Sequence, residues 1–423
     1  MADVKKLRSF IPVTAISHFP IHNLPYGVFK PTRRDDLRIG TAIGDFVLDL
    51  SVIEEEGFFN NTSITGRHIF SRASLNKFMS LGRIVWKEVR SVIQELLDEN
   101  NPTLRDNESL RNKCLIPLSK VHLSLPVKVG SFTDFYSSKE HATNMGIMFR
   151  GKDKALMENW VYMPVAYNGR ISSIVISGTD IQRPWGQMKA EKEKSPSFGP
   201  SQELDFELEM GVFIGPGNRL GKAIPIEKAY DNIFGMVLVN DWSARDIQRW
   251  EYVPLGPFLA KNFATSISPW VVTMEALEPF KTAGPVQDPK PLPYLQSTGK
   301  NAFDIQLEAF IETEYLSSPL KISTTNFKYM YWNVLQQIVH HTVNGCNLLT
   351  GDLLASGTIS GPKPDSFGSL LELTWKGEKP IKLPDNEERT FIQDGDTITI
   401  SGYCQGNGYR VGFGEVSGKI VNK

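Results

Sequence analysis

Apolar and acidic residues alternate along the stretch 206–210, in the order Phe-Glu-Leu-Glu-Met. This two-residue period is typical of a half-buried strand, and it places Glu207 and Glu209 on one face with their Cα atoms about 7 Å apart. The apolar run 235–241 predicts a second, more buried strand that ends in an acid, followed by a polar helix start at Trp242. The pattern therefore brings three carboxylates to two strands.

The same periodicities predict the other elements of the chain. Residues 38–50 are typical of a hairpin that turns at Gly44 and Asp45, and apolar residues at three- and four-residue spacings predict helices over 84–99 and 332–343. Short β-rich runs, separated by Gly and Pro turns, occur at 173–176, 271–274, 305–310, 370–375 and 397–400. The predicted fold is mostly β, of the α+β class, with largely antiparallel strands and a few helices.

The chain of 423 residues is too long for one ordinary hydrophobic core, so we expect two domains. Residues 1–118 hold no dense set of chemical groups, and we interpret them as a small β-domain with helical connections that serves packing or oligomer contact. Residues 119–423 contain the alternating acids and are expected to form the larger domain.

Charge and cysteine content narrow the partner and the compartment. The 46 basic and 47 acidic residues give a net charge of −1, which argues against nucleic acid or an anionic membrane as partner and favours a small molecule. Three widely spaced cysteines argue against a disulfide framework and favour the cytoplasm. The N-terminus lacks an apolar core of signal-peptide length, and no stretch approaches the ~20 apolar residues that span a bilayer.

Further side chains with chemical potential occur outside the alternating stretch. Asp134, Tyr136 and His141 lie within about two helical turns of one another along the chain. Residues 355–362 form a glycine-rich loop whose backbone could approach a ligand closely. Glu372 is a lone carboxylate between two leucines of a predicted strand.

Each of these residues also has an ordinary structural interpretation, which the sequence leaves open. A helix cap would explain Asp134 or Asp241, and a solvated strand face would explain the two glutamates. A surface position would explain His141, and an ion pair would explain Glu372.

Two other polar features are expected to be structural. His340 and His341 are neighbours on a predicted helix and cannot face one way, so we expect one to be partly packed and the other to lie on the surface. The polar run 189–200 predicts a mobile surface loop with solvated charges.

Four long stretches, taken together, resemble the fumarylacetoacetase (fumarylacetoacetate hydrolase) family: SFTDFYSSKEHATNMG, DFELEMGVFIG, VLVNDWSARDIQRWEYVPLGPFLAKNF and LASGTISGPKPDSFGSLLELTWKG. The resemblance covers nearly the whole chain, including an N-terminal domain that shorter members lack. It implies a homodimeric hydrolase that cleaves a carbon–carbon bond of 4-fumarylacetoacetate to give fumarate and acetoacetate, the last step of tyrosine and phenylalanine catabolism. It also implies a fold in which an SH3-like small barrel precedes a β-sandwich roll.

The resemblance further implies roles for individual residues. The metal ligands would be Asp134, Glu207, Glu209 and Asp241, with a second ion beside Lys261 and Thr265. The general base would be His141, oriented by Glu372. The groups that stabilise developing negative charge would be Arg245, Gln248 and Lys261. The substrate contacts would be Tyr136, Arg150, Gln248, Tyr252 and Thr358.

The residue types agree with this chemistry. Four carboxylates without thiolate or imidazole are hard oxygen ligands, which favour Mg²⁺ or Ca²⁺ over zinc. Against a divalent ion they leave two negative charges in excess, which Lys261 and Arg245 could compensate. Arg245, Gln248 and Tyr252 follow a helical i, i+3, i+7 spacing, so that face should look into the site.

Three other functions remain open. Related acylpyruvate or oxo-acid hydrolases and decarboxylases would use the same metal site, although the extra N-terminal domain together with Tyr136 and Arg150 argues against them. A two-carboxylate glycosidase would work without a metal. A metal-stabilised binding protein would show no turnover.

Overall fold

The computed structural model describes residues 7–190 and 192–422. Residues 1–6 lie outside the described residues, and they include the beginning of the N-terminal stretch considered for a signal peptide. Glu191 in the polar run also lies outside them. Among the described residues, no helix combines the length and the apolar character that a membrane crossing requires.

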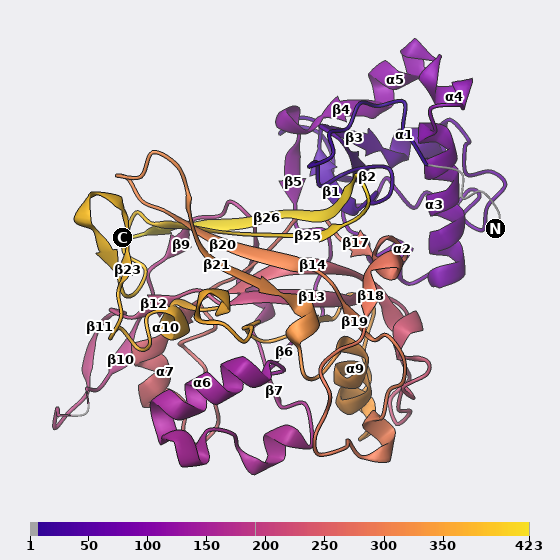
Figure 1. The fold of residues 1–423 in the computed structure, drawn as a ribbon. Coiled ribbons are helices and arrows are strands. Elements are labelled where there is room, and N and C mark those ends of the chain that lie inside the picture. Colours follow the sequence, from indigo (N-terminus) through magenta and orange to yellow (C-terminus); the bar gives the residue numbers. More distant parts are fainter. Residues whose placement is uncertain (1–6, 191, 423) are drawn as a thin grey trace.

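An antiparallel sheet of five strands forms the N-terminal part of the structure, drawn in indigo and purple in Figure 1. In the order of the sheet its strands are β4 (Leu115–Pro117), β3 (Phe46–Asp49), β2 (Arg38–Ile43), β1 (Tyr26–Lys30) and β5 (His122–Ser124). The predicted hairpin is confirmed, because β2 and β3 pair on either side of Gly44, whose φ is 53°.

Helix α3 (Arg83–Leu97) confirms the first predicted helix and packs its apolar face into the N-terminal core. This core also contains Phe213, Phe234 and Val237 of a larger sheet. Tyr26 and Val271 exchange two backbone hydrogen bonds of 3.0 and 2.8 Å between the two parts. The N-terminal part therefore packs directly against one face of the larger sheet.

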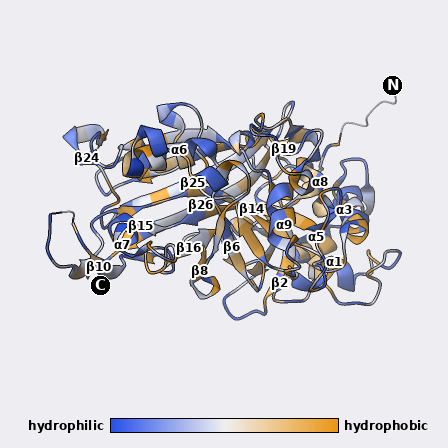
Figure 2. Ribbon diagram, turned by 90° about the horizontal axis from the view of Figure 1, so that it is seen from below, coloured by the Kyte–Doolittle hydropathy of each residue, from blue (hydrophilic) through white to orange (hydrophobic). Residues whose placement is uncertain are grey.

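The larger sheet has eight strands, runs in mixed directions and is buried on both faces. Its main path is β7 (Ala166–Asn168), β6 (Phe132–Phe135), β22 (Leu353–Ala355), β13 (Leu208–Ile214), β14 (Ile233–Asp241), β16 (Thr265–Ile267) and β8 (Ile174–Ile176), with β17 (Val272–Thr273) beside β14. Along β14, Val237 and Val239 join the N-terminal core, whereas Met236 and Leu238 join the main core. Figure 2 shows the hydrophobic character of β14 and β6 within the structure.

A second five-stranded sheet covers the other face of β14 (Figure 1). Its order is β21 (Leu320–Asn326), β20 (Gln306–Glu312), β25 (Thr397–Gln405), β26 (Arg410–Val421) and β9 (Ile181–Gln182). Leu307, Ile398 and Val416 of this sheet contribute to the main core together with Leu238. The structure thus has the mostly β, α+β character that the sequence predicts.

Several predicted boundaries are wrong because tertiary contacts override local preference. Residues 370–375 were predicted as a strand, but Leu370–Leu373 form the short helix α10. The helix expected at Trp242 begins only at Arg245, as α7 (Arg245–Glu251), because Ser243–Ala244 pair as β15 with β12 (Leu204–Asp205). Glu207 consequently lies in the gap between β12 and β13 rather than within one continuous strand.

The predicted helix near residue 340 is confirmed as α9 (Val334–Thr342), but its two histidines differ from the prediction. Both are half-buried: His340 Nδ1 lies 3.0 Å from the Tyr294 hydroxyl and His341 Nε2 lies 2.9 Å from Thr133 Oγ1. Neither histidine is a free surface residue.

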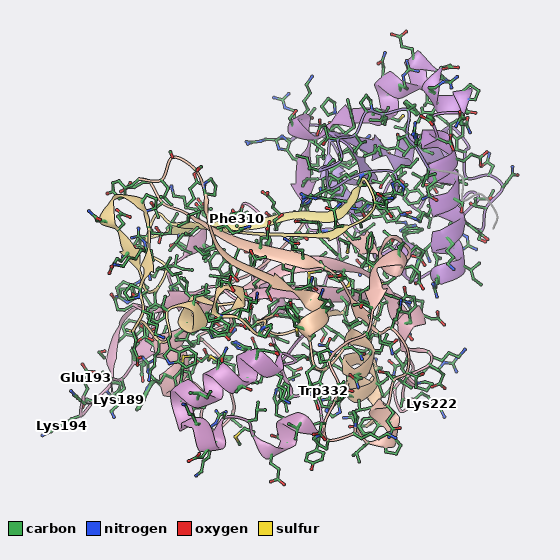
Figure 3. The ribbon with its side chains drawn as sticks, in the orientation of Figure 1. Lys189, Glu193, Lys194, Lys222, Phe310 and Trp332 are labelled. Atoms are coloured by element: carbon green, nitrogen blue, oxygen red, sulfur yellow. The ribbon has the colours of Figure 1, made fainter. Side chains whose placement is uncertain are left out.

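The polar run 189–200 contains regular structure at its end. Strand β11 (Ser197–Pro200) pairs with β10 (Trp185–Met188), so the predicted loop is the tip of a hairpin. Lys189, Glu193 and Lys194 mark this tip, which extends away from the body of the molecule in Figure 3.

Candidate metal centre and active site

Four carboxylates meet at the ends of three strands of the larger sheet. Asp134 lies on β6, Glu209 on β13 with Glu207 just before it, and Asp241 ends β14. One carboxylate oxygen of each lies within 4.8 Å of those of the other three, and all four residues are buried, with at most 5% of their surface exposed. The sequence prediction that these acids share a location agrees with this arrangement.

The ordinary interpretations of these acids do not agree with the structure. The glutamates do not form a solvated strand face, because both are buried. Asp134 and Asp241 cap no helix, because Ser138 is the N-cap of α6 (Lys139–Arg150) and Ala244 is that of α7.

Two buried cations and the hydroxyl of Thr265 are among the groups that contact this cluster. Lys261 Nζ donates hydrogen bonds to Glu207 and to Asp241 Oδ2, the latter at 2.9 Å. Arg245 Nη2 lies 2.8 Å from Glu207 Oε1. Thr265 Oγ1 donates to Asp241 Oδ1 at 2.7 Å. The cations therefore neutralise one side of the cluster.

The other side of the cluster lacks such partners. Asp134 Oδ1 and Glu209 Oε1 are buried and have no hydrogen-bond partner among the residues that the structure describes. Burial raises the pKa of both acids, and repulsion from neighbouring carboxylates, Asp241 for Asp134 and Asp134 for Glu209, raises it further. A bound cation would stabilise their ionised forms, so this donor set fits a hard divalent ion.

Glu207 has the opposite shift. Burial alone would raise its pKa, but the charges of Lys261 and Arg245 outweigh burial and hold the pKa of Glu207 below its usual range. Burial would likewise lower the pKa of Lys261, but Asp241 and Glu207 outweigh it, so the ammonium group stays charged at neutral pH.

His141 and Glu372 form a buried pair beside the acids. His141 Nδ1 lies 2.7 Å from Glu372 Oε2. Asn144, Ser360 and Ser369 donate further hydrogen bonds of 2.8 to 3.0 Å to the same carboxylate. Burial would raise the pKa of Glu372, but His141 and these donors outweigh it and lower the pKa. The pair leaves Nε2 of His141 for contact with a reactant.

A cavity of about 390 Å³ is lined by three of the acids, Asp134, Glu207 and Glu209, and by His141. Tyr136, Gln248, Tyr252 and Thr358 line it together with Lys261, Arg245 and His141. The expectation that one face of α7 looks into the site agrees with these lining residues. Neither Thr265 nor Asp241, to which it donates a hydrogen bond, lines this cavity.

Arg150 lies apart from the main cavity. It lines a smaller adjoining pocket of about 130 Å³ with Tyr136 and Tyr252. Its guanidinium donates to the backbone carbonyls of Lys154 and Ala155 at 3.1 and 2.9 Å. These two bonds use Nε and Nη2 and leave Nη1 of Arg150 for contact with a substrate.

The glycine-rich loop, whose backbone was expected to approach a ligand, packs closely against Phe135 and Glu209. Gly357 has a φ of 77°, and its N–H donates to Glu209 Oε2 at 3.0 Å. A Cβ at this position would lie 2.2 Å from the carbonyl oxygen of Phe135. The glycine is therefore required by the packing of the acidic cluster.

Sequence reasoning missed other polar residues that contact the site. Asp205 continues the acidic alternation by one step, and Asn144 is one helical turn from His141, so both had a local signal. Tyr167, whose hydroxyl donates to Asp241 Oδ2 at 2.9 Å, had none.

Comparison with known proteins gives the family. The family model for the fumarylacetoacetate hydrolase C-terminal region matches residues 131–421, and that for the fumarylacetoacetase N-terminal region matches residues 22–126. The chain belongs to the fumarylacetoacetate hydrolase family. The family resemblance expected from the sequence is thereby confirmed.

Relatives of similar length within this family carry the name fumarylacetoacetase. Those from Dictyostelium discoideum, Homo sapiens and Arabidopsis thaliana are 58%, 56% and 55% identical to this chain, and each alignment covers 98% of both chains. The solved structure of a fumarylacetoacetate hydrolase from the psychrophilic Exiguobacterium antarcticum is 18% identical, with a TM-score of 0.53 over 95% of this chain and 100% of that chain. At 18% identity, the similarity to this solved structure shows a shared fold only.

Proposed function

We propose that the protein is a metal-dependent fumarylacetoacetase, which hydrolyses 4-fumarylacetoacetate to fumarate and acetoacetate. The observation that carries the proposal is a cluster of four buried carboxylates, three of which line one cavity together with His141, whose Nδ1 lies 2.7 Å from Glu372. Relatives named fumarylacetoacetase, at 49% to 58% identity over 98% of the chain, support the choice of substrate. The reaction would be the last step of tyrosine and phenylalanine catabolism.

The acidic cluster would hold Mg²⁺ or Ca²⁺ through Asp134, Glu207, Glu209 and Asp241. When bound, the ion supplies Lewis-acid stabilisation for the negative charge that develops on the carbonyl oxygens of the diketone. Lys261 and Thr265, which both contact Asp241, are the residues we assign to a second ion.

His141 would act as the general base. Its Nε2 takes a proton from water while the water oxygen adds to the carbonyl carbon on the fumaroyl side. The carbon–carbon bond then breaks, its electron pair leaves on the acetoacetate half as an enolate, and a proton returns to that carbon. Glu372, 2.7 Å from Nδ1, fixes the tautomer and stabilises the imidazolium that forms.

The cationic and amide groups would stabilise the charge that develops. Lys261 stays protonated between Glu207 and Asp241. Arg245 Nη1 donates to Gln248 Oε1 at 3.1 Å, which leaves the amide NH₂ group of Gln248 to donate to the substrate. We assign substrate contacts to Gln248 and also to Tyr136, Arg150, Tyr252 and Thr358.

Finer features of the fold and assembly belong to the same proposal. We assign residues 1–118 to an SH3-like domain and 119–423 to a β-sandwich roll, although the pairing of β5 with β1 carries the N-terminal sheet to Ser124. We also propose a homodimer located in the cytoplasm.

A spectrophotometric assay tests the proposed activity. The purified protein should remove the absorbance of fumarylacetoacetate, lose this activity to a chelator and regain it with Mg²⁺ or Ca²⁺. Activity only on acylpyruvates or other oxo-acids would indicate a related hydrolase or decarboxylase instead. Chelator-insensitive hydrolysis of a glycoside, or binding without turnover, would contradict the proposal.

A further inference from the structure

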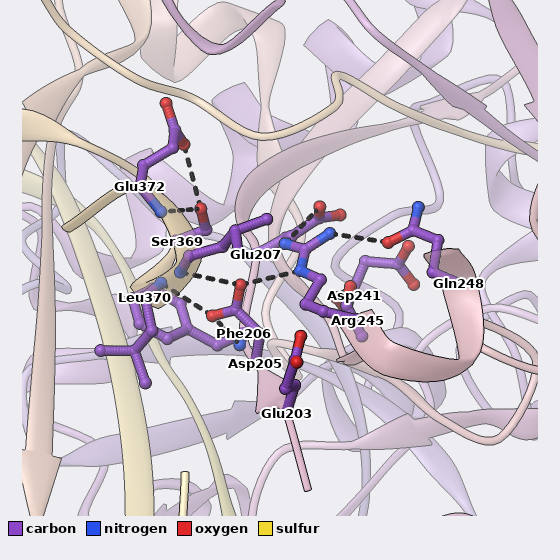
Figure 4. Close-up of polar contacts among 12 residues, drawn as sticks. Glu203, Asp205, Phe206, Glu207, Asp241, Arg245, Gln248, Ser369, Leu370 and Glu372 are labelled. Atoms are coloured by element: carbon purple, nitrogen blue, oxygen red, sulfur yellow. Dashed lines mark hydrogen bonds and ion pairs between the residues drawn. The ribbon is translucent and has the colours of Figure 1, made fainter. Parts of the chain in front are cut away.

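A buried carboxylate outside the assigned set lies between two parts of the site. Asp205 ends strand β12 and is 0% exposed. Four N–H groups donate to it: Oδ1 accepts from Phe206 at 2.8 Å and Leu370 at 2.7 Å, and Oδ2 accepts from Leu371 at 3.1 Å and Arg245 Nε at 2.8 Å. Figure 4 shows Asp205 between Leu370 and Arg245, which come from distant parts of the chain.

One side of this contact fixes helix α10. A helix of four residues has no stability of its own, and the N–H groups of its first turn need acceptors from outside the helix. Asp205 accepts from the first two residues of α10, and Ser369 Oγ accepts from the third, Glu372, at 3.3 Å. Asp205 therefore holds the turn from which Glu372 reaches His141.

The other side of the contact fixes Arg245. Arg245 Nε donates to Asp205 Oδ2, and in this orientation of the planar guanidinium Nη2 lies 2.8 Å from Glu207 and Nη1 lies 3.1 Å from Gln248. The Asp205 carboxylate thus binds both Arg245, the cation beside the acidic cluster, and α10, the helix that carries Glu372. It sets the position of one relative to the other.

We propose that Asp205 is a positioning residue, which couples Arg245 to the His141–Glu372 pair and thereby holds the charge-stabilising group and the general base in one geometry. The inference rests on the proposed hydrolase function and adds a residue to it. Asp205 lines neither pocket of the site, so it acts through Arg245 and through α10.

The variant Asp205→Asn tests this role against a matched control. Asp396 is 1% exposed, accepts from Arg389 Nε at 2.9 Å and from a backbone N–H at 2.9 Å, and lines neither pocket of the site. Both Asp205→Asn and Asp396→Asn should lower the melting temperature, because each weakens a buried ionic contact. Only Asp205→Asn should lower kcat, by about 10- to 100-fold, with a much smaller change in KM and with unchanged metal content.

Two further readouts separate positioning from general destabilisation. In a Glu372→Gln background, Asp205→Asn should lower kcat less than it does alone, because the path through Glu372 is already broken and only the path through Arg245 remains. In ¹⁵N-histidine-labelled protein, the downfield proton signal of the His141–Glu372 hydrogen bond should shift or weaken in Asp205→Asn and persist in Asp396→Asn.

Wild-type kcat and an unaltered His141 signal in Asp205→Asn would overturn the inference, as would additive effects in the double variant. Should Asp205→Asn fail to fold, Asp205→Ser replaces it, because the smaller side chain leaves room for water to accept from the same N–H groups. A wild-type protein inactive on fumarylacetoacetate would instead contradict the proposed function, and the His141 signal, which requires no substrate, would still decide whether Asp205 positions the pair.

Discussion

Replacement of His141 by asparagine separates its role as a base from its role in packing. The imidazole is 2% exposed, and its Nδ1 lies 2.7 Å from Glu372 Oε2. The amide NH₂ of asparagine can donate to Glu372 from nearly the position of Nδ1, but asparagine has no basic nitrogen at the position of Nε2. His141→Asn should therefore remove proton transfer and keep the buried contact.

The expected magnitude follows from these contacts. General-base help is worth about 10²- to 10⁴-fold in rate, which corresponds to about 2.7 to 5.4 kcal/mol in activation free energy. Loss of the contact to Glu372 as well would cost about 1.5 to 3 kcal/mol of stability. Because the asparagine keeps a donor and Asn144, Ser360 and Ser369 still bind the carboxylate, the stability loss should be smaller than this.

The assay measures kcat and KM on fumarylacetoacetate, together with metal content and melting temperature. His341→Asn is a control, because His341 is half-buried and its ring is hydrogen-bonded like that of His141, but it lines neither pocket of the site. We expect kcat to fall only in His141→Asn, with the metal retained in both variants. A kcat for His141→Asn above a tenth of the wild-type value would refute the assignment of His141 as the base.

Three other perturbations address the remaining parts of the site. Asp241→Asn should lose bound metal and activity together, since it removes one of four ligands, and full occupancy by elemental analysis would exclude Asp241 as a ligand. A chelator should lower the melting temperature, because an ion at 100 times its Kd contributes about 2.7 kcal/mol, and Mg²⁺ or Ca²⁺ should restore it; an unchanged temperature would argue against a structural ion. Glu372 has a lowered pKa in the folded state, so its contribution is complete above its ordinary value of 4.5 and is lost as the pH falls through the folded pKa. The stability difference between wild type and Glu372→Gln should therefore narrow below about pH 4.5, and a constant difference in thermal unfolding would contradict this.

The elements that the sequence predicted correctly are those whose signal is local. The hairpin at Gly44, helix α3 and strand β14 follow from residue spacings within one window of the chain. The structure also brings together the four carboxylates whose residue types predict a hard cation, and the cation itself stays a prediction.

The elements that were mispredicted depend on contacts between distant residues. Residues 370–373 combine apolar side chains that suit a strand, yet they form a helical turn because Asp205, 165 residues earlier, accepts the N–H of Leu370. Ser243 pairs as a strand residue with Asp205, another distant partner, so helix α7 begins only at Arg245. No window of local sequence contains both partners of such a contact.

The convergence of the acids also depends on what lies between their strands. β6 and β13 are two strand positions apart, about 10 Å, with β22 between them. β22 ends at Ala355, which pairs with Asp134 on one side and Gly211 on the other. Ala355 and Gly211 have small side chains or none, and Gly357 packs against Phe135 and Glu209. The carboxylates of Asp134 and Glu209 therefore have room to approach each other across β22. The glycine-rich loop thus shapes the acidic cluster at Gly357 through the absence of a side chain, while Ser360 of the same loop donates hydrogen bonds to Glu372.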